Sequence, residues 1–181
     1  MRGEIVVADY DPAWARAFAE EKQRIQTAIG ETLTGIEHVG STAVPGLAAK
    51  PVIDLLVGIR SLADAPRCVA PLAALGYRYI PEYEADLPER RYFQRQNAEG
   101  EHTHHIHMVE PGSEFWRRHL LFRDYLRAHP ETAVEYAALK RALAAQYRSD
   151  RAGYTDAKSD FIARVMAQAE KAFSAKKREK S

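Results

Sequence analysis

The chain has 181 residues, of which 46% are hydrophobic and 28% are charged, and both values are typical of a single globular domain. Its net charge of +1 gives no reason to expect nucleic acid or an anionic membrane as a partner. The single cysteine, Cys68, excludes an internal disulfide, and no apolar run approaches the roughly 20 residues of a membrane helix. The N-terminus reaches acidic residues before a signal sequence could form, so we expect a cytoplasmic protein.

The N-terminal half alternates helical and strand patterns. Asp11 and Pro12 are the expected cap and first residue of an amphipathic helix that ends before Gly30. A later apolar run rich in β-branched residues contains one carboxylate, Asp54, and is typical of a buried strand. In chain order we expect a helix over 11–30, a strand over 36–39, an ordered loop over 40–51, a strand over 52–59 and a helix over 62–75.

The second half of the chain changes from strands to helices. Helical patterns separated by Pro130 and by a short polar region fill its C-terminal part. This order predicts an α+β fold, a mixed β-sheet flanked by helices with a helical C-terminal half. We expect residues 1–175 to form a single domain and residues 176–181 to be a basic, frayed helix end. The expected strands are 77–80, 91–95 and 104–110, and the expected helices are 113–128, 132–147 and 154–173.

The Gly- and Pro-rich loop has the residue types of a phosphate-binding site. Gly40 follows a strand, where a glycine lets a ligand approach the backbone. Ser41 and Thr42 offer hydroxyl and N–H groups to phosphate oxygens, and Lys50 adds positive charge. The structural alternative is a turn capped by Ser41 or Thr42, in which Asp54 pairs with Lys50 or an arginine to hold two strands in register.

Four of the seven histidines fall within six positions. Residues two apart on a strand share a face, so His105 and His107 are expected on one face and His102 and His104 together on the other. Two imidazoles with a facing carboxylate such as Asp54 are a common set of ligands for a divalent transition metal. The alternative is that the histidines form hydrogen bonds within the sheet or line an exposed strand.

Cationic residues occur on two of the expected C-terminal helices. Arg123 and Arg127 are four residues apart, so they share a helix face and could hold a phosphate or carboxylate group together. Lys158 supplies a further cation on the last helix. The alternative for the arginines is ion pairing within their own helix, because Asp124 is adjacent to Arg123.

The run IEHVGSTAVPGLAAKPVIDLLV, with YDPAW before it and RYFQR, HHIHMVE and FRDYLRAHP after it, resembles the GrpB family of bacterial proteins. The match runs in order from about Val6 to Ala172. The resemblance implies a nucleotidyltransferase-like fold. In some actinobacteria a domain of this kind is similar to a C-terminal extension of dephospho-coenzyme A kinase. The resemblance implies no substrate or reaction, because neither is established for the family.

A nucleotidyltransferase-like fold implies a glycine-serine pair, two carboxylates one residue apart on a strand, and a third carboxylate on a later strand, which together hold two metal ions. Gly40 with the serine after it matches the pair, and Asp54 matches the first carboxylate. Leu56 stands where the second carboxylate should be, and His105 or His107 would take the third position. The resemblance therefore implies a site for one divalent ion, Mn, Zn or Ni rather than Mg.

Three functions follow from these patterns. The first is binding of a nucleotide or phosphorylated small molecule, with metal-dependent nucleotidyl transfer to a small acceptor as the natural reaction. The second is a non-catalytic binding or regulatory module of the same fold, which Leu56 favours. The third is a metal-dependent phosphohydrolase. In the first, the substrate-binding residues are Gly40, Ser41, Thr42, Lys50, Arg123, Arg127 and Lys158, the metal ligands are Asp54, His105 and His107, and Asp54 is the catalytic residue.

Overall fold

A five-stranded mixed sheet lies at the centre of the computed structural model, which describes residues 4–179. The strand order is β1-β2-β5-β4-β3. Strands β2 and β5 pair in parallel, and the other neighbours are antiparallel. The strands are β1 (Leu33–Val39), β2 (Ile53–Ile59), β3 (Arg78–Tyr79), β4 (Arg91–Gln96) and β5 (His102–Val109).

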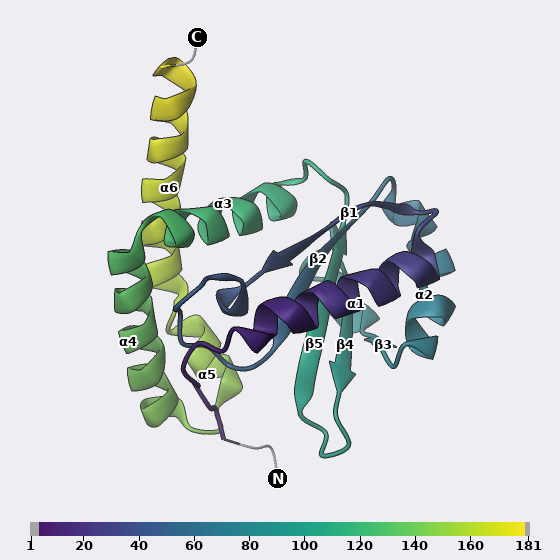
Figure 1. Ribbon diagram of the computed structural model, residues 1–181, viewed down its shortest axis with the longest axis horizontal. Helices are drawn as coiled ribbons and strands as arrows, with labels where there is room; N and C mark the ends of the chain where they lie inside the picture. Colours follow the sequence, from purple (N-terminus) through teal and green to yellow (C-terminus); the bar gives the residue numbers. More distant parts are fainter. Residues whose placement is uncertain (1–3, 180–181) are drawn as a thin grey trace.

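Helices surround this sheet, and the last of them extends away from the body of the protein (Figure 1). The predicted α+β fold with a helical C-terminal half is confirmed. Within residues 4–179, no helix has the combined length and apolarity that a membrane span requires. The helices are α1 (Ala13–Ile29), α2 (Ala65–Ala74), α3 (Glu114–Ala128), α4 (Pro130–Tyr147), α5 (Arg151–Asp156) and α6 (Ser159–Glu179).

Local capping explains where several helices begin. Asp11 accepts a hydrogen bond from the backbone N–H of Ala13 at the start of α1. Ser113 accepts one from the N–H of Trp116 at the start of α3. Gly76 lies just after the end of α2 and has a φ of +90°, the left-handed conformation that is typical of a glycine following a helix.

The predicted helix over 154–173 is wrong in one respect, because the structure divides this segment into α5 and α6. Asp150 accepts a hydrogen bond from the N–H of Gly153 and starts α5 earlier than predicted. The chain then turns at Ala157 and Lys158 before α6 begins. The cap at Asp150 therefore starts a separate short helix, although the apolar residues continue at helical spacing across the turn. Helix α6 continues into the segment predicted to be frayed, whose last residues, 180 and 181, lie outside the described residues.

The alternation of β2 determines which side chains reach the site. Ile53, Leu55 and Val57 are buried in the main core with residues of α1 and α2. Asp54 and Leu56 therefore point to the opposite face, where α3 packs. The carboxylate is thus on the side of the sheet that the C-terminal helices cover.

A second core attaches the C-terminal helices to the loop after β1. Val44 and Leu47 from this loop are fully buried. They pack with Leu126 of α3, Tyr136 of α4 and Val165 of α6. The loop that carries the glycine-serine pair is therefore held between the sheet and the helical half.

Strand β5 contains a bulge that turns the side chain of its first histidine, His102, to the opposite face of the sheet. Consecutive residues of β4 pair with His104 and His102, so Thr103 is an extra residue in β5. The bulge reverses the alternation, and His102 Nδ1 lies 2.9 Å from His105 Nε2. The prediction that His102 and His104 share a face is therefore wrong.

Candidate metal and phosphate site

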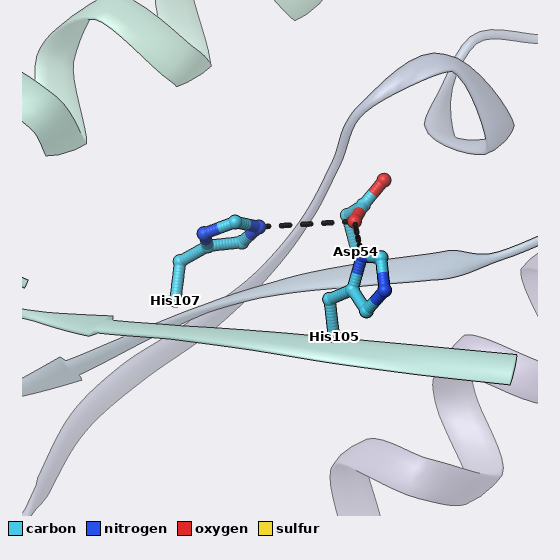
Figure 2. Close-up of side chains that lie close together, drawn as sticks. All are labelled: Asp54, His105 and His107. Carbon is cyan, nitrogen blue, oxygen red and sulfur yellow. Dashed lines mark hydrogen bonds and ion pairs between the residues drawn. The ribbon is translucent and has the colours of Figure 1, made fainter. Parts of the chain in front are cut away.

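Asp54, His105 and His107 lie together on one face of the sheet (Figure 2). Asp54 and His105 are direct partners across the parallel strands β2 and β5. Asp54 Oδ1 lies 3.0 Å from His105 Nδ1 and 3.7 Å from His107 Nε2. Ile106 and Met108 are fully buried on the other face, as the alternation of β5 requires. The structure therefore brings together the three predicted metal ligands.

The protonation states of this group suit metal binding. Burial on its own would raise the pKa of Asp54, but hydrogen bonds from His105 and His107 hold that pKa well below the usual value. Burial lowers the pKa of His107, and the Asp54 carboxylate offsets part of this effect. Asp54 is therefore ionised and His107 neutral at neutral pH, the forms in which both residues coordinate metals.

The donor set fits one divalent transition metal ion. The ligand atoms of Asp54, His105 and His107 lie within 4.8 Å of one another, so a single ion can reach all three. Two imidazole nitrogens with one carboxylate oxygen suit Mn, Zn or Ni better than Mg, which prefers oxygen ligands.

Leu56, where the resemblance leads us to expect a second carboxylate, belongs to the core. Its side chain is fully buried, and it packs with Val39 and Val109 beneath α3. A carboxylate in this apolar environment would lose its hydration without gaining a partner among these residues. The chain therefore lacks the second acidic ligand of a two-metal site on this strand.

Gly40 allows the loop to touch the Asp54 carboxylate. Its backbone has a φ of 72° and a ψ of −174°, a conformation that is essentially restricted to glycine. A Cβ atom at this position would overlap Asp54 Oδ2. The glycine is thus required both by its backbone and by the close approach of the carboxylate.

A cavity of about 270 Å³ opens beside Asp54, between the sheet, the loop after β1 and the helices α4 and α5. Asp54 is the only acidic residue among the described residues that line it. Such an excess of positive charge in a concave site favours an anionic ligand. Four cationic residues line the cavity: Lys50, Lys140, Arg151 and Lys158.

The two hydroxyl residues of the loop both line the cavity but differ in availability. Thr42 is buried, and its hydroxyl donates a hydrogen bond to the carbonyl of Val52 at 3.0 Å. His38 Nε2 lies 3.1 Å from the same hydroxyl. Burial lowers the pKa of His38 to about 4, so its neutral ring is one fixed partner of Thr42. Ser41 is therefore the hydroxyl of the pair that is placed to contact a ligand.

Lys50 and Lys158 reach the cavity from the loop and from the turn before α6. The Lys158 ammonium lies 4.2 Å from the centre of the Tyr154 ring, a favourable cation–π contact. Burial lowers the pKa of both lysines from the usual value. An anion bound between them would recover the electrostatic stabilisation that burial removes.

Arg123 and Arg127 are not among the residues that line the cavity. Arg123 donates to a Glu37 carboxylate oxygen at 2.7 Å and to the carbonyl of His38 at 3.0 Å. Arg127 donates two hydrogen bonds to the carbonyl of Ala43. Both arginines thus hold β1 and the following loop in place from outside, and the structure does not bring them beside Lys50 and Lys158.

Lys140 is a cavity residue that the sequence reasoning missed. It is 3% exposed, and its ammonium donates to the carbonyl of Ala48. Burial lowers its pKa to about 7. The sequence does not single it out, because the buried face of α4 is defined by packing. The other members of that face are uncharged: Thr132, Ala133, Tyr136, Ala137 and Leu143.

His102 and Arg90, which are outside the predicted set, lie within hydrogen-bond distance of the ring nitrogens of His105 and His107. His102 lies against His105, as the bulge dictates. Arg90 Nη1 lies 3.3 Å from His107 Nδ1. The Arg90 guanidinium lies 4.9–5.9 Å from the centres of three aromatic rings, those of Tyr92, Phe115 and Tyr83.

Comparisons with known sequences agree on one family. The family model described as GrpB protein matches residues 4–168. The UPF0157 protein YqkA of Bacillus subtilis is 44% identical over 153 residues, which cover 84% of this chain and 43% of that protein. The glutamate-rich protein GrpB of Alkalihalophilus pseudofirmus is 36% identical over 168 residues, which cover 91% and 95% of the two chains. A dephospho-CoA kinase of Mycolicibacterium paratuberculosis is 32% identical over 170 residues, and the match covers 82% of this chain and 41% of the kinase.

Among solved structures, the conserved protein GrpB from Enterococcus faecalis superposes with a TM-score of 0.84 and 35% sequence identity, covering 93% of this chain and 99% of that chain. The Cid1 poly(U) polymerase gives a TM-score of 0.47 and 10% identity, covering 74% and 40% of the two chains. The chain spans less than half of YqkA and of the kinase, but nearly all of the Enterococcus protein. On the matches to the family model and to the Enterococcus structure, the chain belongs to the GrpB family.

Proposed function

We propose that this protein binds a nucleotide or another phosphorylated small molecule together with one divalent metal ion. The observation that carries the proposal is the cavity beside Asp54, in which four cationic side chains accompany one carboxylate. Phosphate oxygens are strong acceptors for ammonium and guanidinium groups, and their charge complements that of the cavity. Two of the three proposed metal ligands, Asp54 and His105, also line this cavity, and a ligand atom of His107 lies within 4.8 Å of theirs.

Nucleotidyl transfer to a small acceptor is the reaction that we propose for a ligand held in this way. Ser41, Lys50 and Lys158 would bind the phosphates, with Asp54 as a metal ligand. The acceptor hydroxyl would lose its proton to water as its oxygen bonds to the α-phosphorus, and the bond to the departing pyrophosphate would break. When bound, the metal ion would polarise a phosphoryl oxygen and stabilise the charge that develops on it.

Leu56 supports a second candidate function, a non-catalytic binding or regulatory module. Its fully buried side chain replaces the carboxylate that would complete a two-metal site. The length of the dephospho-CoA kinase, of which this chain spans 41%, is consistent with an accessory role beside a catalytic domain. Turnover by the native protein would exclude this candidate, since such a module has no chemistry of its own.

The test is a thermal-shift matrix of the four ribonucleoside triphosphates and coenzyme A precursors, each with Mg, Mn, Zn, Ni or a chelator. A ligand at about 100 times its dissociation constant adds roughly 2.7 kcal/mol, or about 5–10 °C in Tm for a protein of this size. We expect a metal-dependent shift with at least one phosphorylated compound. No shift with any of them would contradict the proposal.

Two double variants test whether the cavity beside Asp54 is the site that causes the thermal shift. We expect the double variant Asp54→Asn, His107→Ala to lose the metal-dependent shift. The matched control is Asp64→Asn, His129→Ala, which makes the same changes at a distance from the cavity. Equal shifts in both double variants would count against the site. Release of inorganic phosphate with Mn or Ni in the same samples would instead indicate a phosphohydrolase.

A further inference from the structure

The hydrogen bonds around Asp54 determine which nitrogen of each histidine carries a hydrogen. An ionised carboxylate only accepts, so His105 Nδ1, 3.0 Å from Asp54 Oδ1, carries an N–H group. Arg90 only donates, so His107 Nδ1, 3.3 Å from its guanidinium, accepts, and the hydrogen of His107 is on Nε2, which faces Asp54 at 3.7 Å (Figure 2). A neutral imidazole has one N–H group, so the opposite nitrogens, His105 Nε2 and His107 Nδ1, are acceptors. The donors that face these acceptors are His102 and Arg90.

His102 and Arg90 differ in whether they can also accept a hydrogen bond. His102 can transfer its hydrogen to its other nitrogen and then accept a hydrogen bond from His105. Arg90 has five N–H donors and no acceptor atom. Arg90 therefore stabilises only the form of His107 in which Nε2 carries the hydrogen.

A histidine that binds a metal needs the opposite arrangement. It gives the lone pair of one nitrogen to the ion and donates the N–H of the other to a carboxylate, a carbonyl or water. If His107 used Nε2 for a metal, its hydrogen would be on Nδ1 and would point at the Arg90 guanidinium, 3.3 Å away. One position of Arg90 thus cannot serve both forms of His107.

Arg90 is held mainly by aromatic rings. Its guanidinium carbon lies 4.9 Å from the ring centre of Tyr92, 5.6 Å from that of Phe115 and 5.9 Å from that of Tyr83. Its Nε is buried without a hydrogen-bond partner within the described part of the chain. The guanidinium can therefore rotate away from His107 without breaking a hydrogen bond from Nε.

We infer that Arg90 controls whether Asp54, His105 and His107 bind a metal ion. While its guanidinium donates to His107 Nδ1, the N–H groups of both histidines point at the Asp54 carboxylate, where a metal ion would bind. Metal binding requires Arg90 to leave His107, so Arg90 is a positioning residue that opposes metal loading. This inference rests on the metal-binding part of the proposed function.

Metal affinity tests the inference directly. In Arg90→Gln the amide oxygen can accept the N–H of His107 Nδ1, so we expect Zn and Mn to bind at least tenfold more tightly in calorimetric titrations of the metal-free protein. Arg90→Met removes the same charge but supplies no acceptor, so its gain should be smaller. Arg67→Gln, which removes an exposed arginine on α2 that pairs with Asp64, should bind as the native protein does. Equal gains in Arg90→Gln and Arg90→Met, or no gain in Arg90→Gln, would overturn the inference.

The tautomer of His107 provides a test that needs no variant and no metal. Histidine ¹⁵N chemical shifts of the native, metal-free protein should show that the hydrogen is on Nε2 of His107, and a hydrogen on Nδ1 would overturn the inference. This measurement decides the matter if Arg90→Gln does not fold. Failure of every protein to bind metal would overturn the inference and the metal part of the proposed function. It would leave phosphate binding, measured separately in chelator, unaffected.

Discussion

Gly40 and Asp54 show how closely single residues are fitted at this site. Gly40→Ala would place a Cβ atom against Asp54 Oδ2 in a backbone conformation that only glycine adopts readily. We expect a loss of about 2 kcal/mol in the free energy of unfolding and the loss of metal binding, measured by urea denaturation and calorimetry. Gly46→Ala is the control, because Gly46 also has a positive φ but nothing lies within 4 Å of its Cβ position. Equal effects of both variants on metal binding would show that the contact with Asp54 is unimportant.

We expect Lys140 to make the proposed phosphate binding depend on pH. Burial lowers its folded pKa to about 7 from a usual value of 10.5, so the unfolded chain binds more protons between these pH values. The charged form of Lys140 therefore costs stability below pH 7, and this cost is relieved as pH rises. A bound phosphate favours the charged form, so the contribution of Lys140 to binding should fall as pH rises through 7.

The comparison of the native protein with Lys140→Met measures this contribution, because the titration of the ligand itself affects both proteins equally. With tripolyphosphate in the presence of a chelator, the native protein should bind roughly tenfold more tightly at pH 6. The two affinities should converge by pH 9. An affinity ratio that does not change with pH would contradict the role of Lys140. Lys22→Met, which changes a lysine on α1 away from the cavity, serves as the control.

Among single residues, the grouping of Asp54, His105 and His107 could be predicted from the sequence, because strand alternation places both histidines on one face and Asp54 lies on a neighbouring strand. The sequence could not predict the positions of His102 and Arg90. The position of His102 depends on the extra residue in the pairing of β4 with β5. The position of Arg90 depends on how the segment before β4 folds back against His107. Lys140 could not be predicted either, because the sequence of α4 has no clear apolar stripe and its buried face follows only from the packing.

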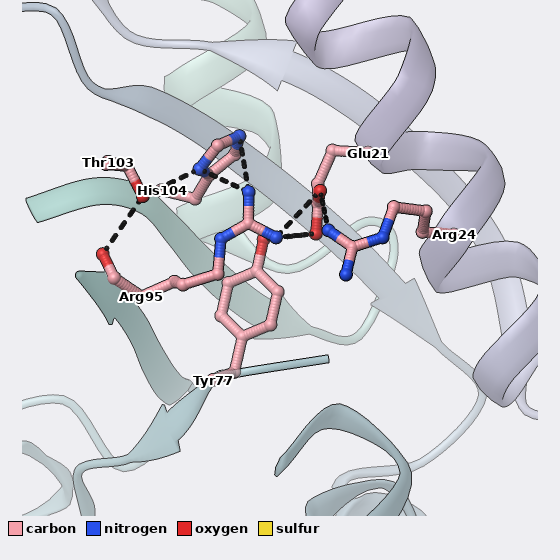
Figure 3. Close-up of polar contacts among 6 residues, drawn as sticks. All are labelled: Glu21, Arg24, Tyr77, Arg95, Thr103 and His104. Carbon is pink, nitrogen blue, oxygen red and sulfur yellow. Dashed lines mark hydrogen bonds and ion pairs between the residues drawn. The ribbon is translucent and has the colours of Figure 1, made fainter. Parts of the chain in front are cut away.

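Helix α1 is tied to the sheet by a buried carboxylate on the face opposite the site (Figure 3). Glu21 is 3% exposed and accepts hydrogen bonds from Tyr77, Arg24 and Arg95. Glu21→Gln would leave these donors facing an amide, and we expect the free energy of unfolding to fall by about 2–4 kcal/mol. The exposed Glu20→Gln on the same helix should change it by less than about 0.5 kcal/mol. Equal urea midpoints for the two variants would show that the cluster does not anchor α1.

His104 extends this cluster and should make the fold sensitive to acid. Arg95 donates to its ring at 2.8 Å, and burial, reinforced by Arg95, lowers its pKa to about 4. The unfolded histidine, with a pKa near 6.5, takes up its proton first, so the free energy of unfolding should fall as pH drops from 6.5 to 4.

The variant His104→Gln removes this titration and should reduce the acid-induced loss by about 1–3 kcal/mol, as measured by urea denaturation across this pH range. His129→Gln on the other side of the molecule should retain the native slope. The same slope in His104→Gln as in the native protein would contradict the assignment.

Secondary structure elements were predictable where caps and apolar spacing agree, as in α1 and α3. They were not predictable where the two signals conflict. The apolar spacing through residues 154–173 continues across a turn that the cap at Asp150 sets up, so one predicted helix becomes α5 and α6. The turn matters for the site, because it places Lys158 beside the cavity.

At the scale of the whole molecule, the candidate site depends on contacts between distant parts of the chain. The sheet and its loop supply Asp54, His105 and Lys50, whereas the C-terminal helices supply Lys140 and the turn before α6 supplies Lys158. The α+β class follows from the order of elements, which is local information. The cavity does not, because it depends on how the helical half packs against the loop after β1.

The central claim is that this cavity binds phosphate groups next to a metal at Asp54. The most direct measurement is anomalous diffraction from crystals grown with Mn and a non-hydrolysable nucleoside triphosphate. We expect an anomalous peak within coordination distance of Asp54 and both histidines, with phosphate density against Lys50, Lys140 and Lys158. An empty cavity, with the nucleotide or the metal bound elsewhere, would contradict it.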